Sequence, residues 1–85
     1  MEIQVTTTKQ TKVSNKWITS ETETQNIDFK KYDLITSKET LQWFRRCGGT
    51  ETATKEYTSR GYKIVKLVST CPLKVIRTIR TFSFN

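Results

Sequence analysis

Eighty-five residues, of which 34% are hydrophobic, and a formal net charge of +7 indicate one small basic domain with a modest core. The chain has no histidine, no phosphate-binding glycine motif and no Cys-x-x-Cys pair, so we predict neither enzymatic catalysis nor a cofactor or metal site. No apolar run approaches the ~20 residues of a membrane span, and the first residues lack a signal-peptide pattern. We therefore expect a cytoplasmic protein without a membrane partner.

The N-terminal segment is predicted to form a β-hairpin. β-branched residues recur at alternate positions between Ile3 and Val13, which favours extended strands over helix. Ser14-Asn15 is a turn signal, and residues 16–19 form the next candidate strand. Residues 20–26 are polar and fit either a loop or a frayed strand.

A short helix over about residues 37–48 is the clearest predicted element, and residues 27–36 connect it to the hairpin. Ser37 is a favoured N-cap residue, and Glu39 places a negative charge in the first turn, where the helix dipole favours it. Gly48-Gly49 ends the helix, because glycine readily adopts the left-handed conformation that follows many helices.

A three-stranded meander is predicted to follow the helix. Its strands cover about residues 50–58, 62–70 and 75–84, with turn signals at Ser59-Arg60-Gly61 and at Cys71-Pro72. The predicted fold class is therefore α+β, with residues 1–85 forming a single domain. An antiparallel sheet, made of the N-terminal hairpin and the C-terminal meander, would pack against the one short helix.

The excess positive charge lies in one part of the sequence. Residues 1–37 carry five basic and five acidic side chains, whereas residues 38–85 carry ten basic and three acidic ones, which accounts for the whole +7. Cations contact phosphates and flat rings stack on bases, so we predict a nucleic-acid-binding surface with low sequence specificity, on which these groups converge on one patch of the sheet. The predicted contact residues are Trp43, Arg45, Arg46, Arg60, Tyr62, Lys63, Lys66, Arg77 and Arg80. Alternatively, the cations form an ordinary solvated surface and the rings belong to the core.

Residues 60–67 partly resemble the RNA-contacting strand motif of RNA-recognition-motif domains. The matches are the leading Arg60, Gly61, the aromatic Tyr62 and the aliphatic Val65. Lysine, isoleucine and leucine occupy the remaining positions, where that motif has a small residue and two aromatic residues, and we do not assign the family. The whole chain, short, threonine-rich and basic, also resembles small uncharacterised bacteriophage accessory proteins, which would place it in a host cytosol.

Three functional classes remain open from the sequence. The first is the nucleic-acid-binding accessory protein, for DNA or RNA. The second is a phage or mobile-element interaction module whose basic surface docks on an acidic host protein. The third is a minor structural or assembly subunit, because a modest core leaves stability to be gained from a homo-oligomer. Cys47 and Cys71 are expected to be free thiols, although the sequence also allows them to pair.

Overall fold

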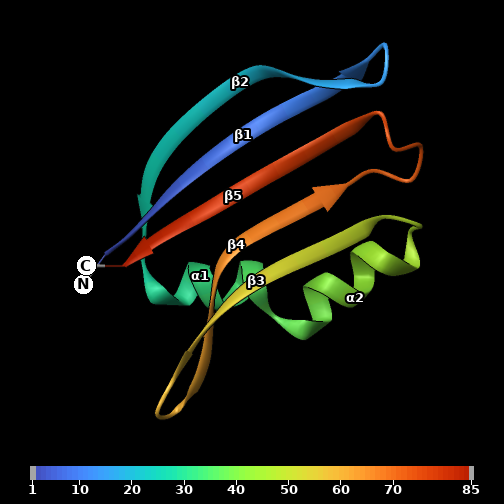
Figure 1. Ribbon diagram of the computed structural model, residues 1–85. Helices are drawn as coiled ribbons and strands as arrows, with labels where there is room; N and C mark the ends of the chain where they lie inside the picture. The colour runs from blue at the N-terminus through green and yellow to red at the C-terminus, as the bar shows by residue number, and fades with distance from the viewer. Residues whose placement is uncertain (1, 85) are drawn as a thin grey trace.

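The five strands found in residues 2–84, the part of the chain that the structure describes, form one antiparallel sheet. The structure is a computed structural model. Its elements are β1 (Ile3–Val13), β2 (Lys16–Ile27), α1 (Phe29–Thr36), α2 (Lys38–Arg46), β3 (Thr50–Thr58), β4 (Gly61–Thr70) and β5 (Ile76–Phe84). The order across the sheet is β2-β1-β5-β4-β3, so the first and last strands are neighbours at its centre (Figure 1).

The predicted α+β class is confirmed, but the layout of the strands differs from the prediction. Pairing of β1 with β5, from Ile3 opposite Phe84 to Thr11 opposite Ile76, joins the hairpin and the meander into one continuous sheet. β2 also runs through residues 20–26, which all lie within the strand. These polar residues form a strand because β1 supplies hydrogen-bonding partners along their length, a tertiary effect that local composition does not encode.

Residues 29–36 form the helix α1, where the sequence pattern predicts only a connecting segment. Asp28 caps it by accepting a hydrogen bond from the Lys31 N–H (2.8 Å). Ser37 ends α1 and also caps α2, accepting a hydrogen bond from the Thr40 N–H (3.2 Å). The predicted 37–48 helix corresponds to α2, and Gly48 follows it with a positive φ of 94°. The helical layer is thus two short helices that meet at Ser37.

The core lies between the sheet and α1. Tyr32 of α1 packs edge-on against Phe82 and Phe84 of β5, with ring centroids 5.1 and 5.2 Å apart. Edge-to-face geometry brings the positive ring edge to the negative ring face, which favours this arrangement. The buried hydrophobic side chains of the described residues are Ile3, Val5, Ile27, Tyr32, Ile64, Leu67 and Phe82.

The hydroxyl of Tyr32 ties the helical layer to β4. It donates a hydrogen bond to the Ile64 carbonyl (2.7 Å) and accepts one from the Ile64 N–H (2.9 Å). β4 pairs with β5 only from Lys66 onwards, and the β3–β4 register shifts between Thr54 and Lys55. The phenol therefore replaces a neighbouring strand at the point where the β3–β4 hairpin bends away from the sheet (Figure 1). Burial raises the pKa of Tyr32.

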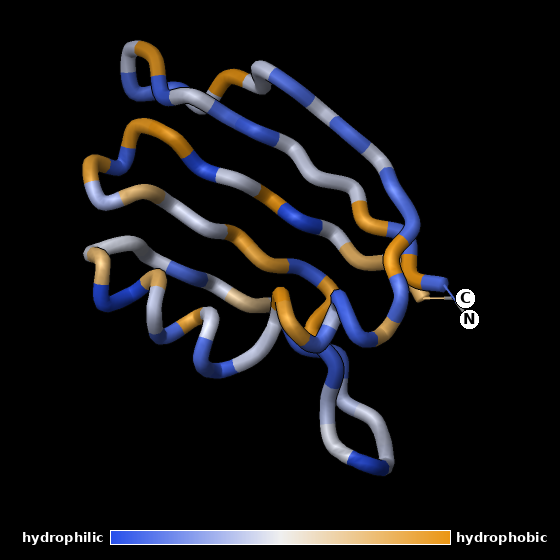
Figure 2. Tube along the Cα trace, turned by 180° about the vertical axis from the view of Figure 1, so that it is seen from behind, coloured by the Kyte–Doolittle hydropathy of each residue, from blue (hydrophilic) through white to orange (hydrophobic). Residues whose placement is uncertain are grey.

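The helices cover only part of one face of the sheet. Both views place α1 and α2 beside the β3–β4 half, and no helix lies over the tip of the β1–β2 hairpin (Figures 1 and 2). The opposite face of the sheet has no helix on it at all in residues 2–84. None of the described helices is both long and apolar enough to cross a membrane.

Candidate functional site

The face of the sheet that points away from the helices, here called the open face, is polar and rich in threonine. In β1 the side chains of Ile3 and Val5 enter the core, so strand alternation turns the even-numbered residues to the open face. Cross-strand hydrogen bonds follow this alternation: the hydroxyls of Thr6 and Thr24 lie 3.4 Å apart, and the Gln10 amide donates to the Thr19 hydroxyl (3.2 Å). These threonines provide a flat surface of hydroxyl donors and acceptors.

Four side chains on the open face form a cluster around Trp17, and we call these four residues the Trp17 cluster. The Arg77 guanidinium lies 4.3 Å from the centroid of the Trp17 ring, and the Lys12 ammonium lies 5.8 Å from it. The Arg77 Nε donates to the side-chain amide oxygen (Oε1) of Gln10 at 2.6 Å. Register explains the assembly, because Lys12 pairs with Trp17 and Gln10 pairs with Arg77. Three strands, β1, β2 and β5, thus contribute to one site.

The charge of the open face is almost entirely positive. Glu21 lies on the other side of the sheet, where it pairs with Lys9 at 3.5 Å, and Glu23 shares that side by alternation. The carboxylate that the described strands bring to the open face is Glu56, on the distant β3–β4 hairpin, and it pairs with Lys63 at 3.5 Å. Among the described strand residues, no carboxylate therefore competes for the cations of the Trp17 cluster on its own face.

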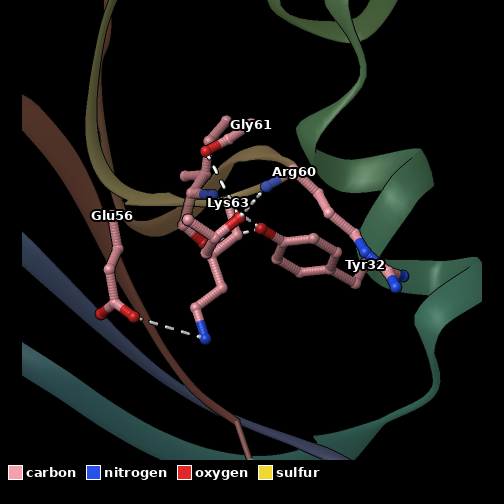
Figure 3. A network of polar contacts seen from close by, with 7 residues as sticks. Tyr32, Glu56, Arg60, Gly61 and Lys63 are labelled. Atoms are coloured by element: carbon pink, nitrogen blue, oxygen red, sulfur yellow. Dashed lines mark hydrogen bonds and ion pairs between the residues drawn. The ribbon is translucent and has the colours of Figure 1, made fainter.

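The predicted contact residues on the sheet do not share one patch. Arg77 belongs to the Trp17 cluster, and Lys66 lies farther along the same open face, beside the buried Leu67. Lys63 forms an ion pair with Glu56 (Figure 3). Its ammonium also lies 4.4 Å from the Phe84 ring centroid. The predicted convergence on a single patch is thus wrong for these cations.

Arg80 faces the helices, on the opposite side of the sheet from Arg77. Residues three apart on a regular strand point to opposite faces, which is the physical reason for the separation. Arg80 lines a groove of about 340 Å³ between α2 and the sheet, together with Glu51. Burial raises the pKa of the Glu51 carboxyl. A hydrogen bond from the Ser69 hydroxyl (2.8 Å) and the positive charges of Arg80 and Arg45 lower this pKa, but by less than burial raises it.

The other predicted residues lie on two further surfaces. Trp43, Arg45 and Arg46 are exposed on α2, and Trp43 borders the groove beneath this helix. Arg60 and Tyr62 belong to the β3–β4 hairpin, which protrudes from the sheet (Figure 1). There the Tyr62 ring lies 4.3 Å from the Lys55 ammonium and 6.1 Å from the Tyr57 ring. The nine residues are therefore divided among the open face, the helix-facing side of the sheet, the exposed surface of α2 and the β3–β4 hairpin.

Three members of the Trp17 cluster, Gln10, Lys12 and Trp17, are absent from the predicted set. A local signal for one pair exists: the two-residue turn Ser14-Asn15 places Lys12 opposite Trp17. The contribution of Arg77 depends on the β1–β5 pairing, which links residues far apart in the sequence.

The two cysteines are free thiols. Hydrogen bonds from the backbone of Val75 and Ile76 lower the pKa of the Cys71 thiol, and the Ile76 N–H lies 3.4 Å from its sulfur. Within residues 2–84, no three His, Cys, Asp or Glu side chains come close enough together to hold a metal ion.

Comparisons with protein-family models, with curated proteins and with solved structures find no match to this chain. Its function is therefore inferred from surface chemistry. The Trp17 cluster combines an indole ring, two cations and an amide on a flat face of hydroxyls. Such a surface can stack on an unpaired base, neutralise phosphates and donate hydrogen bonds to sugar and phosphate oxygens.

Proposed function

We propose that this protein is a small nucleic-acid-binding accessory protein that holds a single strand on the open face with low sequence specificity. The observation that carries this proposal is the Trp17 cluster, where Arg77 and Lys12 flank an indole on a face without a nearby carboxylate. Binding of the phosphate backbone requires cations that are not already neutralised. Stacking on an aromatic ring holds any base, because every base has a π-face.

The strand would pass the Trp17 cluster and continue towards Lys66. Lys66 is four residues along β4 from Thr70, which lies opposite Arg77. At about 3.3 Å per residue this separates the two cations by roughly 13 Å, which is a span of two to three nucleotides of extended single strand. Val68 and Ile79, a cross-strand pair on the open face, lie between them. The contact would be short, and its affinity modest.

A titration with fluorescently labelled oligo(dT) and oligo(U) of about 20 nucleotides, at 50 and 200 mM salt, tests the proposal. Three phosphate contacts, from Lys12, Lys66 and Arg77, give a salt slope of about −2 for single strands. The dissociation constant should therefore rise about 20-fold between the two salt concentrations. Affinity weaker than about 100 μM at 50 mM salt would rule the proposal out.

Two double variants with the same loss of charge separate this site from non-specific attraction. Lys12→Gln with Arg77→Gln removes two cations from the open face, whereas Lys30→Gln with Lys31→Gln removes two exposed cations from α1. We expect the first pair to weaken binding at least tenfold more than the second. Equal losses would place the binding elsewhere. Retention of a stoichiometric protein partner from a nuclease-treated lysate, without oligonucleotide binding, would favour an acidic protein as the ligand.

A further inference from the structure

The helix-facing side of the sheet is only half covered. Five strands about 4.8 Å apart span roughly 19 Å between the edge strands, whereas one helix covers about 10 Å. α1 packs against the end of β5, and α2 continues from it beside β3, so the helical layer is one helix wide (Figures 1 and 2). The space over the outer ends of β1, β2 and β5 would accommodate one more helix.

Apolar side chains occupy this uncovered space. Ile18, Thr11 and Ile76 form one row across β2, β1 and β5, and the two isoleucines are 51% and 52% exposed. Val13 lies next to this row on the same side by alternation. We call Val13, Ile18 and Ile76, with the flanking Glu21 and Glu23, the uncovered patch. Trp43 of α2, which is 67% exposed, borders it across the groove beneath α2.

The total accessible surface is larger than expected for a monomer of this mass. A folded 9.9 kDa monomer should expose about 5,200 Å², whereas this chain exposes 6,210 Å². The excess of roughly 1,000 Å² per chain is similar to the ~800 Å² that each partner buries in a standard stable interface. The area left exposed is thus about the area that association would cover.

We propose that the uncovered patch is a dimer interface whose occupant is α2 of a second copy of this chain. α2 projects from the sheet directly beside the uncovered patch. Two copies can therefore fit together with α2 of each copy on the uncovered patch of the other. A two-fold axis parallel to α2 would place each α2 over the other copy's patch, with Trp43 near the axis. The result is a pair of helices between two sheets. Both open faces, with their Trp17 clusters, then point outwards.

The charges allow two copies to approach at this surface. Lys9 and Lys16, on the helix-facing side of β1 and β2, balance Glu21 and Glu23, so this surface carries no net charge in a protein of +7. α2 itself carries Lys38, Arg45 and Arg46 against Glu39, so two copies repel each other where the helices meet, and salt screens this repulsion. Dimerisation should therefore strengthen as salt rises, whereas nucleic-acid binding on the open face should weaken.

Sedimentation velocity of the whole chain, from 5 to 200 μM protein and at 50 and 500 mM salt, tests the proposal. We expect a dimer of twice the 9.9 kDa chain mass, favoured at the higher salt concentration. Ile18→Lys places a charge at the centre of the interface and should raise the dissociation constant at least about tenfold. Because Ile18 is half exposed in the single chain, this variant should still fold, which circular dichroism checks.

Leu34→Lys is the matched control, because Leu34 is an exposed apolar residue of α1 outside the uncovered patch, at 69% exposure against 51% for Ile18. It should leave the dimer unchanged. A strict monomer at 200 μM and 500 mM salt would overturn the proposal, as would a dimer that persists in Ile18→Lys. Oligonucleotide binding depends on the opposite face of the sheet, so either proposal can fail without the other.

Discussion

Removing one oxygen atom from Tyr32 should weaken the fold more than its size implies. In Tyr32→Phe the ring keeps its edge-on packing against Phe82 and Phe84, but the Ile64 N–H and carbonyl lose the partner that now serves both. Tyr32 and Ile64 are each only 7% exposed, so water cannot readily replace the phenol. A buried backbone group left without a hydrogen bond costs about 1–3 kcal/mol.

Two such groups give an expected loss of about 2–6 kcal/mol in the free energy of unfolding. For a domain of this length, each kcal/mol lowers Tm by about 4–8 °C. Urea denaturation followed by circular dichroism measures the loss, with the slope m unchanged if only stability is altered. Tyr57→Phe is the control, because Tyr57 is 77% exposed and should change stability by less than about 0.5 kcal/mol. A Tyr32→Phe variant as stable as this control would refute the bridging role of the phenol.

Three further predictions concern the helix-facing side of the sheet. Gly49→Ala should cost about 1–3 kcal/mol by urea denaturation, because the added Cβ would overlap the Phe44 ring. Leu67→Ala should cost about 2–5 kcal/mol in the same assay, since Leu67 is among the most deeply buried side chains. Burial raises the folded pKa of Glu51 above its ordinary value of 4.5, so stability falls as pH rises above that value. Glu51→Gln should therefore raise Tm at pH 7, with a gain that shrinks as the pH approaches 4.5, as measured by thermal melts across this range.

Local sequence signals were sufficient for most of the secondary structure. Ser37 and Gly48 mark the ends of α2 because capping is a property of a few adjacent residues. The Ser14-Asn15 turn was identifiable for the same reason, since both residues have the positive φ that such a turn requires. α1 was missed because it is eight residues long, and its stability depends on the packing of Tyr32 in the core.

The candidate site was harder to predict, because it depends on which strands are neighbours. Strand alternation correctly places Lys63 and Tyr62 on opposite faces of β4. The register shift near Ile64 then changes which face the following residues of β4 occupy. The same rule, applied to Arg77 and Arg80, places them on opposite faces. No local pattern reveals that Arg77 would meet Trp17, since that contact requires β5 to pair with β1.

The central position of the β1–β5 pair also has a consequence for how the chain reaches its native state. Ile3 pairs with Phe84, so the middle of the sheet closes only when the two most distant segments of the domain meet. Closing so long a loop slows folding relative to a protein with mainly local contacts. During synthesis β1 has no β5 to pair with until the end of the chain leaves the ribosome, so Ile3 and Val5 stay exposed to solvent until then. Any delay at that stage would leave the newly made chain open to aggregation or to proteolysis.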